Sequence, residues 1–380
     1  MRTVRDNGEI TTMFNKRSDM VVHEEAPYNA EPTPAALAAS FVTPTDTFYS
    51  RNHGPIPDLD PDAWRLRVDG LVEQPLTLTL ADLQTRFETV TVAATMQCAG
   101  NRRAGLIAVH DIPGEDPWGP TATSTATWTG ARLSDVLADA TPAAAAQHIC
   151  FEAPDVSQIA TPPAPYGGSI PIAKASAPEV LLVWAMNGEP LEAVHGAPLR
   201  VLVPGYIGAR SVKWLQRITA STEPSQNYFQ ATAYRLLPAE ADPTTAGPGD
   251  GLSLGAVALN SAVLTPADGA SVPAGPVPVS GYAFAGGDRA VARVDVSVDG
   301  GSTWIQADLG QDRGGWVWRM WHATVEVPTG DVEIIARAWD TSAASQPEDP
   351  APLWNPKGYV NNSWPRITVR AIASDGITRR

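Results

Sequence analysis

The strongest constraint on the fold is a run of alternating residues in the last third of the chain. The segment VARVDVSVDGGSTWIQADLG, residues 291–310, alternates apolar and polar side chains on both sides of the tripeptide DGG at 299–301. Such alternation buries one face of a strand, and a Gly-containing turn between two alternating runs is a hairpin signal. The alternation continues in GWVWRMWHATVEV at 315–327 and in DVEIIARAWD at 331–340. Several short strands within about 115 residues predict a β-sandwich of immunoglobulin-like size, which we place at residues 255–380.

The chain before this sandwich mixes short strand-like and short helical segments. Strand-like runs are expected at 64–71, 89–94 and 198–205, and helices at 81–87 and 132–140. These segments are too irregular for repeated βαβ units, so residues 41–237 are predicted to form an α+β domain. Residues 1–40 are polar and Pro-rich, and we expect a surface arm there. Residues 238–254 are rich in Pro, Gly, Ala and acids without periodicity, which predicts a linker.

Length and composition limit the class of protein. A chain of 380 residues is long enough for two domains and buries a large core without disulfides. The formal net charge of −14 argues against an overall nucleic-acid-binding surface. The longest apolar run, 180–186, is far shorter than the roughly 20 residues of a membrane-spanning helix. The N-terminal segment lacks the apolar run of a secretory signal, so we expect a cytoplasmic protein that binds neither nucleic acid nor membrane.

The two cysteines, Cys98 and Cys150, form no CxxC pair. This count excludes a disulfide framework, a zinc site of the usual spacing and an iron–sulfur cluster held by four thiolates. Cys150 is expected to be a buried structural residue.

The densest cluster of chemically capable residues is MQCAGNRR, residues 96–103. Cys98 lies five residues before Arg103, and nearby positive charge is expected to lower the pKa of its thiol. A thiolate is a nucleophile and a ligand for soft metals, and the arginine pair would also bind an oxyanion. The alternative is a buried structural cysteine beside surface arginines.

A second cluster is FYSRNHG, residues 48–54. Arg51, Asn52 and His53 are consecutive polar side chains with different hydrogen-bonding habits, which suits a polar ligand. A solvated turn is the alternative.

A third cluster, HGAPLRVLVPGYIGARSVKWL at 195–215, brackets a strand and a Gly-rich turn. Its polar members are His195, Arg200, Arg210, Ser211 and Lys213. Basic side chains beside exposed backbone amides suit a phosphate group, although the glycines match neither GxGxxG nor the Walker pattern. An ordinary strand and turn with salt bridges is the alternative.

Two readings from other classes remain open at this point. Cys98 and His195 could form a thiol-protease pair, although the arginines beside Cys98 favour an anionic ligand. The chain could also be an adhesion or binding protein whose sandwich recognises partners, but that hypothesis leaves the first and third clusters unexplained.

The three clusters, in this order, resemble the sulfite oxidase family of molybdenum enzymes. The resemblance runs from about Tyr28 to Val369, and CAGNRR, HGAPLR and SVKWL are its most specific motifs. It implies a mixed α/β molybdopterin-binding domain of sulfite oxidase type, followed by an immunoglobulin-like dimerisation domain. It also implies a homodimer of the haem-free type, with molybdenum and molybdopterin as cofactors.

The resemblance assigns roles to individual residues. Cys98 would be the protein ligand of molybdenum. The cofactor-binding residues would be Tyr49, Ser50, Arg51, Asn52, His53, Asp155, His195, Arg200, Ser211, Val212 and Lys213. The catalytic residues would be Arg51, Arg103, Trp118, Tyr234 and Lys357. Lys357 stands where the family usually carries an arginine, and lysine lacks the planar two-pronged donor.

The activity implied by the resemblance is oxidation of sulfite to sulfate by oxo transfer at a Cys-ligated molybdenum centre. Electrons would pass to oxygen or to a separate carrier such as a cytochrome, and the acidic net charge favours a basic carrier. The alternative activity is a nitrate-reductase-like or other oxo transfer on the same scaffold.

Overall fold

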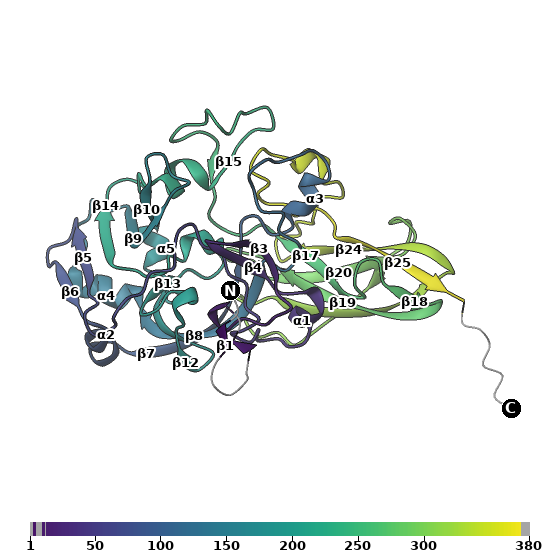
Figure 1. Ribbon diagram of the computed structural model, residues 1–380, viewed down its shortest axis with the longest axis horizontal. Coiled ribbons are helices and arrows are strands. Elements are labelled where there is room, and N and C mark those ends of the chain that lie inside the picture. The colour runs from purple at the N-terminus through teal and green to yellow at the C-terminus, as the bar shows by residue number, and fades with distance from the viewer. Residues whose placement is uncertain (1–2, 5–9, 12, 374–380) are drawn as a thin grey trace.

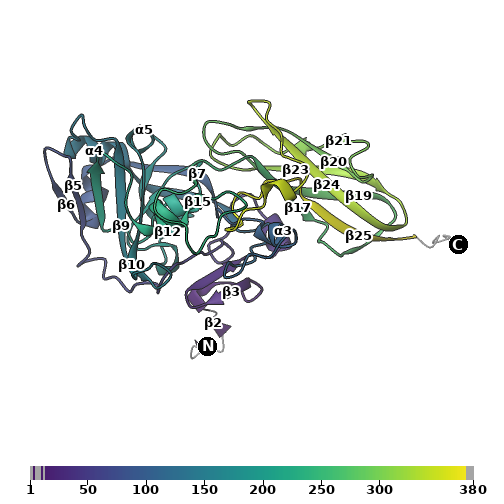
Figure 2. The same ribbon diagram turned by 90° about the horizontal axis from the view of Figure 1, so that it is seen from above.

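The computed structural model arranges the chain as two lobes that lie side by side (Figure 1, Figure 2). It describes residues 3–4, 10–11 and 13–373, so the other residues of the predicted arm (1–40) and sandwich (255–380) lie outside the described residues. The first lobe mixes helices and two sheets, and the second is built almost entirely of strands. The predicted class, an α+β lobe followed by an immunoglobulin-like sandwich, is confirmed; the boundaries at 41–237 and 238–254 stay predictions.

Two five-stranded sheets form the first lobe. One has the order β10–β9–β14–β5–β6, in which only β14 and β5 run parallel. Its strands are β5 (Leu66–Gly70), β6 (Leu76–Leu78), β9 (His148–Ser157), β10 (Ala164–Pro171) and β14 (Arg217–Ser221). The other has the order β12–β11–β8–β7, with β13 also paired to β11. Its strands are β7 (Thr89–Gln97), β8 (Thr123–Arg132), β11 (Leu181–Met186), β12 (Glu189–Pro190) and β13 (Arg200–Leu202).

The helices of this lobe are short, and two of the five described α-helices begin at a threonine whose side chain caps the first turn. α2 (Leu80–Arg86) starts with a capping box formed by Thr79 and Asp82. α4 (Leu133–Ala140) buries Leu133 and Leu137 on its inner side, which explains why its helical spacing is visible in the sequence. The others are α1 (Pro34–Ala38), α3 (Arg103–Ile107) and α5 (Ile172–Ala175). Within the described residues, no helix has the length and apolar character needed to cross a membrane.

The N-terminal segment packs more deeply than a surface arm would. β3 (Val21–Glu25) and β4 (Tyr28–Glu31) form a hairpin, while β1 (Thr3–Val4) pairs with β2 (Ile10–Thr11). All four residues of β4 are buried. The carboxylate of Glu31 accepts hydrogen bonds from the backbone N–H groups of Gly119 (2.5 Å) and Thr121 (3.0 Å). Polar residues that suggested an exposed arm therefore form hydrogen bonds with buried backbone groups of the first lobe.

The second lobe is a sandwich of two sheets, with the orders β17–β19–β23–β22 and β18–β25–β24–β20–β21. The first holds β17 (Asn260–Thr265), β19 (Gly275–Phe284), β22 (Asp308–Leu309) and β23 (Arg319–Val327). The second holds β18 (Ser271–Pro273), β20 (Val291–Ser297), β21 (Ile305–Gln306), β24 (Gly330–Asp340) and β25 (Arg366–Ile372). The predicted hairpin is confirmed between β20 and β21, across a turn in which Gly300 and Gly301 have positive φ. The alternating run after that turn is shared between the two sheets.

Specific hydrogen bonds join the lobes. The indole N–H of Trp318 donates to the carbonyl of Phe41 (3.1 Å). Residues 350–364 of the second lobe return beside α3, as Figure 1 shows. There the indole of Trp354 donates to the carbonyl of His110 (2.8 Å). This return segment carries Lys357 to the first lobe.

The segment expected to be a linker is held at its base. β15 (Arg235–Leu236) pairs with β16 (Leu252–Ser253) on its other side. The Arg235 guanidinium donates to the carbonyls of Gly249 and Gly251, each at 2.6 Å. The segment is thus a closed loop rather than a free tether.

Candidate functional site

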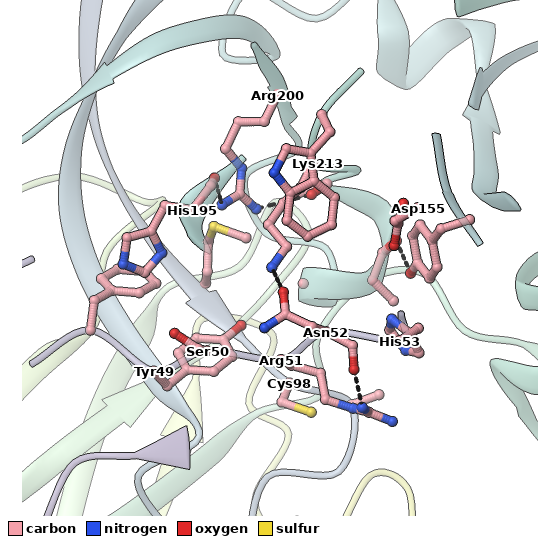
Figure 3. Close-up of a pocket in the computed structure, with 18 of the residues that line it drawn as sticks. Tyr49, Ser50, Arg51, Asn52, His53, Cys98, Asp155, His195, Arg200 and Lys213 are labelled. Carbon is pink, nitrogen blue, oxygen red and sulfur yellow. Dashed lines mark hydrogen bonds between the residues drawn. The ribbon is translucent and has the colours of Figure 1, made fainter. Parts of the chain in front are cut away.

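The described part of the chain contains a pocket of about 650 Å³, partly open to solvent, inside the first lobe (Figure 3). Twelve of the predicted site residues line it, from segments far apart in the sequence. They are Tyr49, Ser50, Arg51, Asn52, His53, Cys98, Asp155, His195, Arg200, Ser211, Lys213 and Tyr234.

Cys98 follows the end of β7 and is buried in the pocket wall. Its backbone N–H donates to the carbonyl of Ala122 (2.9 Å), and the N–H of Gly100 donates to its Sγ (3.4 Å). Burial raises the pKa of the Cys98 thiol, against the opposing charges of Arg103 and Arg51. The expectation of a lowered pKa is therefore wrong, because loss of hydration outweighs the nearby charges. A coordinating metal deprotonates such a thiol.

The two arginines after Cys98 point to different partners. Arg102, with φ 66°, donates to Asn260 Oδ1 (3.0 Å) and to the carbonyl of Ser363 (2.7 Å) in the second lobe. Burial lowers the pKa of Arg102 to about 10. The hypothesis that both arginines bind one oxyanion is therefore wrong for Arg102, which joins the lobes.

The loop at 48–53 is anchored by the N-terminal hairpin. The backbone N–H of Asn52 donates to Asn29 Oδ1 (2.6 Å), and its side-chain amide donates to the carbonyl of Tyr28 (2.5 Å). His53 Nε2 lies 2.6 Å from the Tyr234 hydroxyl. Burial and the charge of Arg51 hold the pKa of His53 well below its usual range. The alternative of a solvated turn is excluded.

The opposite wall is rich in buried polar groups. Arg200 donates to the carbonyls of His195 and Ser211, both at 2.9 Å, while its Nε has no partner among the described residues. Lys213 Nζ donates to Asn52 Oδ1 and to the carbonyl of Val194 (3.0 Å). Burial holds the pKa of Lys213 well below its usual range.

Asp155 and Ser50 add unsatisfied oxygens to this pocket. Asp155 Oδ1 and Ser50 Oγ are buried without a hydrogen-bond partner in the described part of the chain. Burial raises the pKa of Asp155 to about 7, although Lys213 opposes the rise. Unpaired buried polar atoms are costly, so their gathering here indicates a polar ligand that completes them.

This wall fits a phosphate-bearing cofactor. The pocket lining favours a negatively charged group, because it contains three cationic side chains and one carboxylate. The cations are Arg51, Arg200 and Lys213, and the carboxylate is Asp155. Within 13–373, no group of three or more His, Cys, Asp and Glu residues could hold a metal ion. A metal bound at Cys98 would therefore take its other ligands from a bound group, as a dithiolene cofactor allows.

Family comparisons agree with this chemistry. Residues 53–229 match the family described as "Oxidoreductase molybdopterin binding domain", and residues 253–372 match "Mo-co oxidoreductase dimerisation domain". The sulfite oxidase of Arabidopsis thaliana is 37% identical, over 97% of this chain and 98% of that protein. This chain belongs to the sulfite oxidase family. The family's cofactor, molybdenum bound to molybdopterin, confirms the cofactor prediction.

Other relatives within the family differ in length and in name. The mitochondrial sulfite oxidase of Rattus norvegicus is 43% identical over 92% of this chain and 65% of its own length. The chain thus spans about two thirds of the animal sulfite oxidases that it matches. The NAD(P)H nitrate reductase of Hordeum vulgare is 37% identical over 90% of this chain and 41% of that protein.

A solved structure supports the fold. The sulfane dehydrogenase SoxCD of Paracoccus pantotrophus superposes with a TM-score of 0.78 at 26% identity. The match covers 92% of this chain and 86% of that one.

Four predicted residues do not line the pocket. Arg103 pairs with Glu115 (Nη2 to Oε2, 3.1 Å), and Lys357 pairs with the same carboxylate (Nζ to Oε1, 3.3 Å). Trp118 is fully buried, with its ring 4.6 Å from that of His23. Val212 is a core residue whose carbonyl accepts a hydrogen bond from Val201 (3.0 Å). The roles of these residues stay predictions.

Sequence reasoning missed seven lining residues, which are Phe48, Met96, Ala99, Tyr166, Gly208, Ala209 and Trp214. Six of them lie inside the motifs already singled out, so the motifs themselves carried a signal. Gly208 is required because a Cβ there would lie 2.6 Å from the Tyr49 hydroxyl oxygen. Tyr166 lies on β10, outside every motif, and packs 4.6 Å from the His53 ring.

Proposed function

We propose that this chain oxidises sulfite to sulfate at a molybdenum ion held by Cys98 and molybdopterin. One observation carries the proposal: a buried thiol shares a pocket with Arg51 and Tyr234 on one side and with a phosphate-type cluster on the other. When bound, the cofactor supplies oxo transfer and the change of two electrons. The protein supplies binding, orientation and charge.

The pocket residues would divide the cofactor between them. Cys98 Sγ would ligate the metal. Arg200 and Lys213 would bind the phosphate, since arginine and lysine donors suit an anion in a buried site. Ser50 Oγ and Asp155 Oδ1, which lack partners in the described part of the chain, would bind polar atoms of the pterin.

Arg51 and Tyr234 would bind the substrate. The Arg51 guanidinium lies near the Cys98 thiol and is the lining cation on that side of the pocket. Burial raises the pKa of Tyr234, so its hydroxyl stays protonated and can donate to a substrate oxygen. Neutral His53, 2.6 Å away, can accept or return that proton at Nε2.

A second candidate function is reduction of nitrate or of another oxo compound. The pairing of Arg103 and Lys357 with Glu115 favours it, because one carboxylate offsets two of the cations expected to attract a dianion. The relative named a nitrate reductase is consistent with this alternative.

Turnover assays separate the two candidates. The molybdenum-loaded protein should form sulfate from sulfite with an artificial electron acceptor, and Cys98→Ser should not. Consumption of nitrate with a chemical reductant, without sulfate formation from sulfite, would replace the first candidate by the second.

The partners are also proposals. A homodimer would form through residues 253–372, and light scattering at twice the monomer mass would support it. Electrons would pass to a basic carrier attracted by the net charge of −14, rather than to oxygen. A turnover rate with cytochrome c that does not fall with rising salt would contradict the carrier proposal. The cytoplasmic location stays a prediction.

A further inference from the structure

A lysine of the N-terminal segment is buried directly behind the cofactor pocket. Lys16 is 2% exposed. Its Nζ lies 2.6 Å from the carbonyl of Thr45, 2.9 Å from the carbonyl of Phe48 and 2.7 Å from His195 Nε2. No carboxylate within the described residues forms a salt bridge with it. Burying an ammonium group without a paired carboxylate is costly, so we looked to its hydrogen bonds for a function.

The hydrogen bonds around Lys16 fix the proton on His195. An ammonium group has three donors and no acceptor, and three acceptors surround Nζ. While Lys16 carries its charge, His195 Nε2 accepts a hydrogen bond from it, so the ring is neutral and carries its proton on Nδ1. The Thr45 carbonyl, which would accept from an Nε2–H, lies farther from Nε2, at 3.4 Å. Burial and the charges of Lys16, Lys213 and Arg200 hold the pKa of His195 well below its usual range, which agrees with a neutral ring.

The remaining ring nitrogen is left for the pocket. His195 lines the cavity, and its Nδ1 has no hydrogen-bond partner among the described residues (Figure 3). Lys16 also bonds the two carbonyls at Thr45 and Phe48, next to the pocket loop at 49–53. One side chain thus holds both the loop and the imidazole.

We propose that Lys16 is a positioning residue that holds His195 as an Nδ1–H donor toward molybdopterin. The N-terminal segment thereby becomes part of the cofactor site. The proposal requires the cofactor of the family and does not depend on sulfite as the substrate.

The same geometry has a second protonation state. Neutral Lys16 would offer a lone pair to His195 Nε2–H, so Nδ1 would face the pocket as an acceptor. Burial lowers the pKa of Lys16 to about 7, against the charges of Glu192 and Asp46, which favour the ammonium form. Raising the pH through this value should weaken cofactor binding, because the donor at Nδ1 is lost.

Two measurements on purified protein test the proposal. The first is the ¹⁵N spectrum of histidine-labelled protein, in which His195→Gln identifies the His195 signals among the six histidines. We expect the Nδ1–H tautomer in the wild type at pH 6 and its loss in Lys16→Met. An Nε2–H tautomer in the wild type at pH 6 would overturn the proposal.

The second measurement is the molybdenum and pterin content per chain after gel filtration. Lys16→Met should retain about 10-fold less cofactor than the wild type, by analogy with the loss of the hydrogen-bond partner of a metal-ligating histidine. Arg17→Met, at an exposed neighbour paired with Asp19, is the matched control and should retain the full content.

A double-mutant cycle separates positioning from general stability. If Lys16 acts through His195, Lys16→Met should cause little further loss in a His195→Gln background. Losses that multiply in the double variant would overturn the proposal, because Lys16 would then act only by holding the loop.

Discussion

Replacing Asp155 by asparagine should stabilise the fold of the cofactor-free protein. The same substitution should weaken the binding of molybdopterin. Asp155 is 4% exposed, its Oδ1 has no partner among the described residues, and burial raises its pKa from 3.8 to about 7. The folded state therefore holds the proton more tightly than the unfolded chain does. The stability contributed by this group falls as the pH rises from about 4 to about 7.

The magnitude follows from that pKa change. At about 1.4 kcal/mol for each pH unit, the charged carboxylate costs up to ~4 kcal/mol of unfolding free energy above pH 7. The substitution also removes the attraction between Lys213 and the charged Asp155 carboxylate, so this value is an upper bound. Between pH 5.5 and pH 8, the advantage of Asp155→Asn should grow by about 2 kcal/mol.

The assay is urea unfolding of cofactor-free protein at pH 5.5 and pH 8. Glu152→Gln, at an exposed position of the same strand β9 and outside the pocket lining, is the matched control. In cofactor-loaded protein the substitution should be unfavourable. Asp155→Asn should retain less molybdopterin than the wild type. A lower stability of Asp155→Asn than of the wild type at pH 8 would refute the reasoning. A difference in unfolding free energy between the two proteins that is the same at both pH values would also refute it.

Three further substitutions test the rest of the site. Cys98→Ser should keep the thermal unfolding temperature and abolish sulfite turnover; near-normal turnover would remove Cys98 from the metal. Arg51→Gln should raise the KM for sulfite at least about 10-fold while the molybdenum content stays near that of the wild type, because a charged hydrogen bond to the substrate is lost. Equal losses of both would assign Arg51 to the cofactor. Glu115→Gln should free Arg103 and Lys357, lower the KM for sulfite and tighten competitive inhibition by sulfate. Unchanged sulfate inhibition would show that the Glu115 carboxylate does not limit anion binding.

Local patterns in the sequence predicted the secondary structure and the core of the site. The hairpin around Gly300 follows from alternation on both sides of a glycine turn, and α4 follows from the helical spacing of Leu133 and Leu137. Cys98 could be singled out because its motif is compact and chemically unusual.

Partners distant in the sequence could not be predicted in the same way. Arg102 and Arg103 are adjacent, yet Arg102 donates to Asn260 and Ser363, while Arg103 pairs with Glu115 and donates to the carbonyl of Lys357. Glu115 is 242 residues from Lys357, and Lys16 is 179 residues from His195. Only the packing of the lobes brings such pairs together, and no local pattern encodes it.

The most direct test of the site and its substrate is an anaerobic visible absorption spectrum of the purified, molybdenum-loaded protein before and after sulfite is added. We predict a sulfur-to-molybdenum charge-transfer band that bleaches with sulfite in the wild type and is absent in Cys98→Ser. A band in Cys98→Ser as strong as in the wild type, or a wild-type band that sulfite leaves unchanged, would contradict a sulfite-reducible molybdenum site at Cys98.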